Sequence, residues 1–424
     1  VFILTPERAR ELFKFKDLFN IGLFLIDEAQ LSEENLRGLT FDSLIRRINT
    51  EFPNATKVFA YPFINNPQAQ FEKHNITENS SYKSYKQNSV GKIYLTPIKG
   101  DIFAYRPTFK PDRYYYTRNI IKKILKQQGT TILIYASKTK IYSKKLFEDF
   151  RDYLDLCDEI TNSNAIKIIK ELQEYIGATE DEKVSNLVKM MKRGIVIHHG
   201  SIPLKARFLI EKFINSGYAK ICFATSTLLQ GINMPFDLVW IDNYRFRGNE
   251  DKKSLEIKNL IGRAGRSKSL SNAFDYGFVI VPKENYNNFL ERLNIDTKIR
   301  NTSELDNEDF SSLPDDAKDL VEATRNNTFD DELQITELQK ERIKNANLDD
   351  DIKLILDNMF IDNNIINATN YKNMNNNTRE LVKNSFKNIF VKHLRRKNLS
   401  YAEQSILSVA LRILLWRVQG RSFS

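Results

Sequence analysis

Cysteine is nearly absent from this sequence of 424 residues. Cys157 and Cys222 stand far apart, which excludes a disulfide framework and a cysteine-rich zinc site. The four histidines show no HxxxH or HExxH spacing, so the common histidine-based metal motifs are excluded too. No apolar run reaches the length of a membrane span, and no secretory signal pattern opens the sequence. We therefore expect a cytoplasmic protein with no membrane partner.

Acidic residues are in the minority, and many of them lie in one stretch. The 64 Lys and Arg against 54 Asp and Glu give a formal net charge of +10. Residues 304–351 hold 16 acidic and 5 basic residues, a net of −11, so the rest of the chain carries +21. A remainder that basic favours a polyanionic partner such as nucleic acid. The acidic stretch is expected to be a solvated helical surface or a linker.

Short apolar runs that end in turn or polar residues recur through the first two-thirds of the chain, and they are typical of buried strands. They occupy residues 21–26, 57–60, 131–135, 194–197, 221–224, 238–241 and 276–281. Stretches with a helical period lie between them, among them residues 137–153 and 204–214. Strands that are apolar on both faces and alternate with helices predict an α/β fold with parallel sheet.

A basic, aromatic stretch at residues 105–116, which contains Pro107 and Pro111, marks a first domain boundary. We place this boundary between a domain at residues 1–106 and a second domain at residues 107–300. The aromatic side chains of the stretch could stack on nucleic-acid bases. Packing within a linker is the interpretation that we favour.

The chain changes character again near residue 301. Strand-like runs cease there, so we expect a mainly helical accessory region at residues 301–424, through which a protein partner could bind. An Asn-rich segment at 363–377 is expected to form a loop. Ser400 and Glu403 have the spacing of a helix capping box. The apolar residues after them predict a helix face made of Ile406, Val409, Ala410, Ile413 and Leu414.

Two adjacent acids, Asp27 and Glu28, directly follow the apolar run at residues 21–26, within the sequence DEAQ. Ligands of open α/β sheets bind beyond the carboxyl ends of the strands, so these acids could hold Mg²⁺ and orient a water molecule. On its own, the tetrapeptide is explained equally well as an acidic pair that opens a loop.

A second cluster, NLIGRAGR at residues 259–266, combines two glycines with Arg263 and Arg266. Glycine allows close packing, and guanidinium groups present planar donors suited to phosphate oxygens. The sequence ATSTLLQGINMP at residues 224–235 includes the end of an apolar run and the polar loop after it. The hydroxyl and N–H groups of that loop could clamp a nucleic-acid backbone and reach a nucleotide. The alternatives are an incidental basic helix and a polar loop without a ligand.

In this order, these elements resemble the Ski-like group of superfamily 2 DExH-box helicases, over about residues 1–282. DEAQ is similar to motif II, ATSTLLQGINMP to motif V and NLIGRAGR to motif VI, while HHG at residues 198–200 is similar to the element before motif V. Residues 5–8 and 134–138 match motifs Ib and IV only by position. The resemblance implies two RecA-like parallel-sheet domains, the first one incomplete, with ATP between them and a single strand of DNA or RNA crossing both.

The resemblance also implies a role for each matching residue. Asp27 would bind Mg²⁺ together with ATP, and Glu28 would polarise the attacking water. Arg263 and Arg266 would stabilise charge on the γ-phosphate. The nucleotide would also contact Gln30, Gly231, Asn233 and Asn259. The nucleic-acid backbone would contact Thr5, Arg8, Ser137, His199, Gly200, Thr225 and Ser226.

The chain departs from the family pattern in several places. None of its 15 glycines lies in the phosphate-loop pattern GxxxxGK[ST] that an ATPase needs, so we expect the full-length protein to supply that element upstream. Gln30 replaces the usual His or Asp of motif II, and Asn259 replaces the usual Gln of motif VI. Ala60, Tyr61 and Pro62 stand where motif III usually has Ser-Ala-Thr, so coupling between hydrolysis and strand separation is expected to differ.

We therefore expect the motor core of an ATP-dependent helicase or translocase. The alternative is a helicase-derived scaffold that binds nucleic acid or a partner protein and hydrolyses no ATP, which the missing phosphate loop favours. The richness in Asn, Lys and Ile resembles a low-GC bacterial proteome. Bacterial antiphage systems such as Hachiman use helicases of this kind, so the resemblance extends to antiphage defence.

Overall fold

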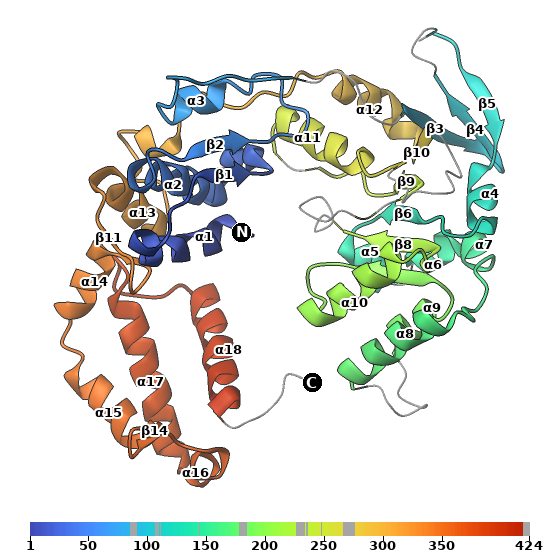
Figure 1. The fold of residues 1–424 in the computed structure, drawn as a ribbon. Coiled ribbons are helices and arrows are strands. Elements are labelled where there is room, and N and C mark those ends of the chain that lie inside the picture. Colours follow the sequence, from blue (N-terminus) through green and yellow to red (C-terminus); the bar gives the residue numbers. More distant parts are fainter. Residues whose placement is uncertain are drawn as a thin grey trace. The chain divides into compact units, whose positions relative to one another are not determined.

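The chain forms two compact units in the computed structural model (Figure 1). Unit 1 combines residues 1–61 and 66–82 with those from 299 onward, and unit 2 holds residues 62–65 and 83–298. The structure describes residues 1–84, 91–106, 110, 112–143, 145–177, 185–225, 234, 236–246, 248–265 and 276–418.

Unit 2 is built on a mixed sheet of eight strands. Six strands are parallel, and β4 and β5 extend one end of the sheet as an antiparallel hairpin (Figure 1). In spatial order the strands are β5 (Tyr115–Arg118), β4 (Ile102–Tyr105), β3 (Gly91–Lys99), β10 (Tyr276–Ile280), β9 (Leu238–Ile241), β6 (Ile132–Tyr135), β8 (Ile221–Ala224) and β7 (Ile195–His198).

The central strands of this sheet are buried on both faces, as their continuous apolar runs predict. Every residue of β6 and of β8 is buried. Alternate residues enter different cores: Leu133 lies in one hydrophobic cluster, and Ile134 lies in the other. This alternation is why an uninterrupted apolar run forms a parallel strand covered by helices on both sides.

Helices cover both faces of the sheet. One cluster contains residues of α8 (Ser163–Tyr175), α9 (Asn186–Met191), α10 (Leu204–Asn215), α11 (Glu250–Ile261) and α12 (Tyr286–Leu293), the last preceded by the turn η5 (Lys283–Asn285). The other cluster contains residues of α4 (Ile120–Lys126), α5 (Lys138–Tyr142), α6 (Lys145–Asp149) and α7 (Arg151–Leu154). The helix expected at residues 137–153 is thus divided into α5, α6 and the start of α7.

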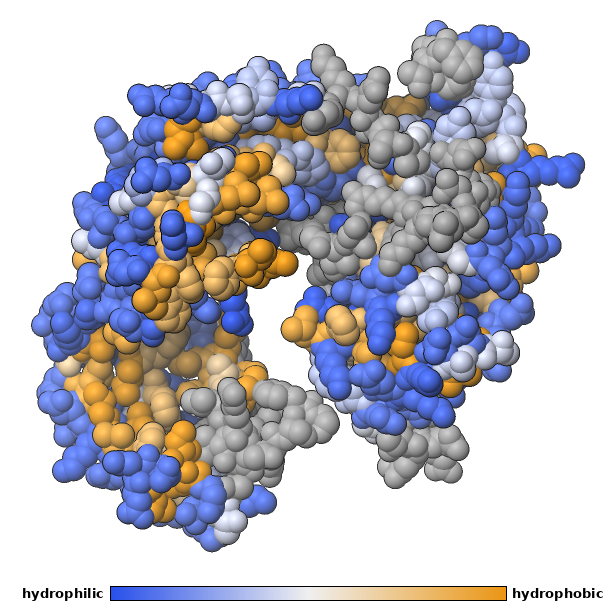
Figure 2. All heavy atoms as spheres, in the orientation of Figure 1, coloured by the Kyte–Doolittle hydropathy of each residue, from blue (hydrophilic) through white to orange (hydrophobic). Residues whose placement is uncertain are grey.

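Unit 1 contains a parallel pair of strands, β1 (Leu23–Ile26) and β2 (Thr56–Phe59), joined through α2 (Asn35–Glu51). One face of the pair, with Phe24 and Phe59, packs on the core of α2. On the other face Leu25 and Val58 are 68% and 43% exposed. In Figure 2 hydrophobic atoms gather at the surface where Figure 1 places these N-terminal elements. Three short elements complete this part, α1 (Pro6–Ala9), η1 (Arg10–Leu18) and α3 (Ala69–Lys73), with η2 (Ala29–Glu33) after β1.

The region from residue 299 onward is mainly helical and packs within unit 1. Leu39 of α2 forms a hydrophobic cluster with Leu305 and Val321, and the Ser43 and Thr324 hydroxyls lie 2.6 Å apart. The elements are η6 (Glu304–Asp306), α13 (Asp315–Asn326), β11 (Phe329–Asp330), β12 (Ile335–Thr336), α14 (Glu337–Lys344), α15 (Asp349–Met359), β13 (Phe360–Ile361), β14 (Asn364–Ile365), α16 (Ala368–Asn373), α17 (Asn376–Lys392) and α18 (Tyr401–Val418).

The α/β class and the helical C-terminal region are confirmed, while several local expectations are corrected. The expected boundary at 106/107 falls inside the β4–β5 hairpin, because β3 pairs with β10 and draws residues 91–118 into the sheet of unit 2. The stretch at residues 105–116 is therefore not a linker. The Asn-rich segment is also not a simple loop: Asn367 and Asn375 accept N–H bonds as N-caps of α16 and α17.

Candidate functional site

In unit 1 the acidic pair lies directly beyond the carboxyl end of β1. Glu28 has a left-handed backbone, with φ of 54°, and its N–H donates to Asp27 Oδ1 at 2.9 Å. Gln30 is buried, and its amide Nε2 donates to the Glu28 carboxylate. Asp27 is exposed. The tight turn thus leaves one carboxylate facing solvent and holds the other through the amide of Gln30.

The segment at the motif III position is hydrogen bonded to this turn. Ala29 N–H donates to the Ala60 carbonyl oxygen at 3.0 Å, and Ala60 N–H donates to the Ile26 carbonyl oxygen at 2.9 Å. The hydroxyl of Tyr61 is buried without a hydrogen-bond partner among the described residues, and burial raises the pKa of this phenol. The backbone of residues 60–61 therefore supports the acidic turn, although the hydroxyl groups expected of motif III are absent.

The motif Ib residues lie in a surface turn of unit 1. Thr5 is the N-cap of α1, and its hydroxyl accepts the Arg8 N–H at 3.4 Å. Arg8 is exposed and lies 3.6 Å from the Glu11 carboxylate. Such an exposed pair is worth little, so the Arg8 guanidinium can exchange this partner for a phosphate.

In unit 2 the structure brings together four of the predicted nucleic-acid contacts at one edge of the sheet. Ser137 follows β6, Thr225 follows β8, and His199 and Gly200 follow β7, and these three strands are neighbours. Thr225 N–H donates to the His198 carbonyl oxygen at 3.3 Å. The carboxyl ends of parallel strands meet at one edge, so this is where the fold presents its loops to a ligand.

His199 is held in one orientation by its neighbours. Its Nδ1 accepts the Ser201 N–H at 3.2 Å, so the neutral ring carries its proton on Nε2, 3.1 Å from the Tyr142 hydroxyl. Burial and the nearby charge of Lys138 lower the pKa of His199. The ring is therefore neutral near pH 7 and acts as a hydrogen-bonding group rather than as a cation.

Sequence reasoning missed two residues of this cluster, Lys138 and Tyr142. Lys138 Nζ lies 2.5 Å from Ser201 Oγ, and the ring of Tyr142, whose hydroxyl meets His199, is 61% exposed. The sequence did contain a signal for them: both residues lie in the short helix that begins directly after Ser137, which was predicted to contact nucleic acid.

His198, the neighbour of His199, is packed into the fold. The side chain is fully buried, and its Nε2 lies 2.9 Å from the Glu211 carboxylate. Burial lowers the pKa of His198, with Glu211 opposing that effect. His198 thus ties β7 to α10 beneath the loop that carries His199.

Arg263 is anchored at the end of α11. Its side chain is 5% exposed, and Gly265 N–H donates to the Phe236 carbonyl oxygen at 2.7 Å. A Cβ on Gly277 would lie 2.5 Å from backbone atoms of Ala264. The backbone of residues 263–265 is therefore pressed against β10. Asn259 lies in the last turn of α11 and is half-buried.

Part of the predicted site lies outside the described residues. Four predicted contacts lie outside them, namely Arg266, Gly231, Asn233 and Ser226. Within the described ranges, no cluster of three or more His, Cys, Asp or Glu side chains could hold a metal. None of the helices in the described part of the chain has the length and apolarity needed to traverse a bilayer.

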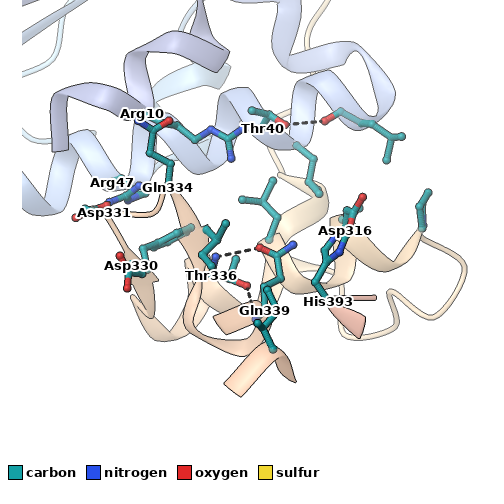
Figure 3. A pocket seen from close by; sticks show the side chains of 18 residues that line it. Arg10, Thr40, Arg47, Asp316, Asp330, Asp331, Gln334, Thr336, Gln339 and His393 are labelled. Atoms are coloured by element: carbon teal, nitrogen blue, oxygen red, sulfur yellow. Dashed lines mark hydrogen bonds and ion pairs between the residues drawn. The ribbon is translucent and has the colours of Figure 1, made fainter. Parts of the chain in front are cut away.

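A pocket of about 550 Å³ lies elsewhere in unit 1, and none of the predicted site residues lines it. Figure 3 shows Arg47 beside Asp331 at one end, with His393 and Asp316 at the other. The Arg47 guanidinium lies 3.8 Å from the ring centroid of Phe13, and it donates to Asp331 at 2.5 Å. These contacts join α2 to the β11–β12 hairpin, so this pocket is part of the packing of unit 1.

No protein-family model matches the sequence, but it is similar to several helicases. It is 25% identical to the ATP-dependent DNA helicase Hel308 of Pyrococcus horikoshii over 276 residues, which is 63% of this chain and 36% of that protein. It is 28% identical to the Hachiman protein HamB of Bacillus cereus over 310 residues, covering 63% of this chain and 27% of that protein. The yeast (Saccharomyces cerevisiae) antiviral helicase SKI2 is 29% identical over 134 residues, which is 30% of this chain and 10% of that protein.

These relatives are superfamily 2 helicases, and the chain resembles them as its motifs predict. The matched segment spans only about a third of the archaeal Hel308 proteins.

Proposed function

We propose that this chain is the motor core of an ATP-dependent nucleic-acid helicase or translocase, in which ATP hydrolysis moves a single strand of DNA or RNA stepwise. The observation that carries the proposal is the similarity to ATP-dependent DNA helicases over 63% of the chain. The placement of Ser137, His199 and Thr225 at adjacent strand ends supports it.

ATP and Mg²⁺ are the cofactors that this proposal requires, and Asp27 fits the metal. Mg²⁺ in proteins is usually held by one or two carboxylates together with substrate phosphates. Asp27 offers an exposed carboxylate at the end of a parallel strand, with one oxygen fixed by the Glu28 N–H. When bound, Mg²⁺ would neutralise charge on the phosphate oxygens. Gln30, Gly231, Asn233 and Asn259 are the proposed nucleotide contacts.

Glu28 is the proposed base. Its carboxylate would orient a water molecule and accept its proton, and the left-handed turn together with the Gln30 amide fixes where that carboxylate lies. Arg263 and Arg266 would stabilise negative charge on the phosphates. The tight backbone at residues 263–265 supports this role, because a positioned donor needs no reorganisation when charge develops.

Hydroxyl, amide and imidazole groups are the proposed contacts to the strand. Ser137 and Thr225 supply hydroxyls, Gly200 an exposed backbone, and His199 a neutral ring with a fixed proton. Thr5, Arg8 and Ser226 complete the proposed set. Such contacts position a sugar-phosphate backbone without reading its sequence, which suits a motor that must move along any strand.

The test is ATP hydrolysis by the full-length gene product, with and without single-stranded DNA and RNA. Glu28→Gln keeps the size and position of the side chain and removes the base, so we expect hydrolysis to fall on the order of 10²- to 10⁴-fold. Asp17→Asn is the matched control, because Asp17 is an exposed acid on η1. Stimulated hydrolysis that survives Glu28→Gln would contradict the proposed role.

The second candidate is a scaffold that binds nucleic acid or a partner protein and hydrolyses no ATP. The observation that favours it is that no GxxxxGK[ST] pattern occurs among the 424 residues. If the gene product binds nucleic acid with strong salt dependence but shows no stimulated hydrolysis, the scaffold is the correct assignment.

The similarity to a Hachiman protein supports a role in antiphage defence as the biological setting. Bacteria that carry the gene with its neighbours are expected to resist phage. Replacement of Glu28 by Gln should abolish that resistance if the motor is required, and a scaffold would retain it.

A further inference from the structure

Three consecutive tyrosines, with basic residues around them, lie at the start of the edge strand of unit 2. β5 forms the outer end of the eight-stranded sheet, and Tyr114 directly precedes it. Residues 99–126 contain eight Lys or Arg and two Asp or Glu. The basic residues of this segment, among them Arg118 on β5 and three lysines on α4, therefore create a positive field at this end of the sheet. Figure 2 shows mostly hydrophilic surface over the described part of this hairpin.

Tyr114 packs into the fold and is not available to a ligand. Its ring lies 6.4 Å from that of Tyr286, and the Arg106 guanidinium lies 4.3 Å from its centroid. Tyr115 is half-buried, with its ring 5.8 Å from that of Tyr105. These two rings stabilise the hairpin.

Tyr116 differs from both of its neighbours. It pairs with Ala104 across the ladder, and it is 67% exposed although Ala104 is buried. Arg118 lies two residues further along the strand, on the same face at about 7 Å, and is also exposed. An aromatic ring and a guanidinium thus stand side by side on an edge strand.

The two acidic residues at positions 99–126 are too few to neutralise the eight basic residues of this segment. Asp101 is bound by Lys122 at 2.7 Å and by Asn119 at 3.0 Å, and these bonds lower the pKa of Asp101, so it stays ionised within a pair. Asp112 is the other acid of the segment. The complementary partner for this surface is therefore a polyanion.

We propose that Tyr116 and Arg118 form a second contact for single-stranded nucleic acid, separate from the residues at the ends of β6, β8 and β7. The Tyr116 ring stacks on a base, and the Arg118 guanidinium binds an adjacent phosphate. Every base has an aromatic face, so stacking of this kind tolerates any sequence. The proposal rests on the proposed function for the identity of the partner, but it needs no ATP hydrolysis.

The test is equilibrium binding of the full chain, without ATP, to 20-nucleotide oligo-thymidylate and oligo-uridylate, followed by fluorescence anisotropy. Tyr116→Ala should weaken binding about 5- to 100-fold and leave the salt dependence unchanged, because it removes stacking and no charge. Tyr116→Phe should bind as the wild type does. Arg118→Ala should reduce the slope of log K against log salt by about 0.7. The oligonucleotide that the wild-type chain binds more tightly identifies DNA or RNA as the preferred strand.

Tyr401→Ala is the matched control, since Tyr401 on α18 is 87% exposed. It should leave binding unchanged, and so exclude a general effect of removing a surface ring. Photo-crosslinking with 5-iodouracil oligonucleotides should label the peptide that contains Tyr116. Wild-type affinity of Tyr116→Ala for both oligonucleotides would overturn the proposal, whether or not this peptide is labelled.

The outcomes separate this inference from the proposed function. Stimulated ATP hydrolysis with wild-type binding by Tyr116→Ala would overturn the second contact and leave the motor intact. Loss of binding in Tyr116→Ala, in a gene product that hydrolyses no ATP, would support the second contact and contradict the motor.

Discussion

Gln30, for which sequence reasoning expected a nucleotide contact, also bonds to the acidic turn in the structure. Its amide donates to the Glu28 carboxylate while its own side chain is buried. A buried donor of this kind fixes the position of a carboxylate that is itself half-buried. If Glu28 is the base, as we propose, Gln30 would therefore act on the chemistry through Glu28.

Replacement of Gln30 by Ala should therefore lower kcat for ATP hydrolysis about 10- to 100-fold, because a misplaced base loses its orientation. The KM for ATP should change little if Gln30 acts only through Glu28. Steady-state kinetics of the gene product would measure both constants, with the exposed Gln404→Ala as control. An increase in KM at constant kcat would instead show that Gln30 binds the nucleotide.

Buried histidines make stability depend on pH. Burial lowers the pKa of His74, His198 and His199. An unfolded chain takes up these protons near pH 6.5, and the folded chain does so only at lower pH. Stability is therefore fully present above about pH 6.5 and is lost as the pH falls below it.

His198→Gln tests this dependence, because the amide keeps a donor for Glu211 and removes the titration. The fall in melting temperature between pH 7.5 and pH 5 should be smaller in the variant than in the wild type. Thermal unfolding followed by circular dichroism at both pH values would measure it. An equal fall in the two proteins would show that His198 contributes nothing to the pH dependence.

Among the elements, β10 sets the position of the arginine segment through a single glycine. A Cβ at Gly277 would lie 2.5 Å from the carbonyl carbon and oxygen of Ala264, which are backbone atoms that cannot rotate away. Gly277→Ala should destabilise the protein by about 1–3 kcal/mol and should displace Arg263.

Gly22→Ala is a suitable control, because nothing lies within 4 Å of a Cβ built at that glycine. Urea denaturation would measure the free energy of unfolding for both variants. Equal stability of the two variants would show that the segment at residues 263–265 can shift at no cost.

The elements that sequence reasoning predicted best are those whose pattern has one explanation. β8 and β9 have the bounds predicted for them, because a continuous apolar run of four residues between polar turns has the length of a buried strand and is too short for a helix. The capping box of α18 is confirmed, since Glu403 N–H donates to Ser400 Oγ at 3.4 Å and Ser400 N–H donates to the Glu403 carboxylate at 2.8 Å. The Ser400 hydroxyl also donates to this carboxylate, and the bonds from Ser400 lower the pKa of Glu403 to about 2.

Other elements depended on tertiary partners that the sequence does not name. The predicted apolar face of α18 is wrong: Ile406 is 69% exposed, and Leu407 and Leu411 are buried instead. Apolar residues lie all around this helix, so periodicity alone could not choose the packed side. The β4–β5 hairpin was missed because Pro107 and Pro111 suggested a linker, while its pairing depends on the distant strand β10.

The candidate site was predictable in part. The resemblance to helicase motifs gave Ser137, His199 and Thr225 as contacts, and the structure places them at the ends of neighbouring parallel strands, at one edge of the sheet. Tyr142 was not identified, because its contact with His199 spans 57 residues of sequence. The roles of Asp27, Glu28 and Arg263 remain proposals that only the kinetic experiments test.

On the scale of the whole molecule, unit 1 is assembled from segments at the two ends of the chain. Arg47 of α2 joins them: its guanidinium lies between the rings of Phe13 and Phe329, at 3.8 and 4.1 Å, and it donates to Asp331. Arg46, its neighbour, makes a more exposed pair with Asp306 at 2.7 Å.

Arg47→Met should cost about 3–5 kcal/mol of unfolding free energy, because it leaves the partly buried Asp331 without its partner. Arg46→Met should cost less than about 1 kcal/mol, since exposed pairs contribute little. Chemical denaturation of the two variants gives a direct comparison. Similar losses in both would show that the stacked arginine is not what holds the segments together.

Ser43 and Thr324, whose hydroxyl groups are in contact, lie 281 residues apart in the sequence. This separation determines how long after Ser43 its partner is synthesised. A ribosome that adds about 5–20 residues per second needs roughly 15–55 seconds to make the chain between them. During that interval the complete sequence of unit 2 emerges and can fold, while α2 waits with Leu39 uncovered, because Leu305 and Val321, which pack on it, are not yet made. A chaperone that binds nascent apolar segments would find its target on α2 during the interval before Thr324 is made.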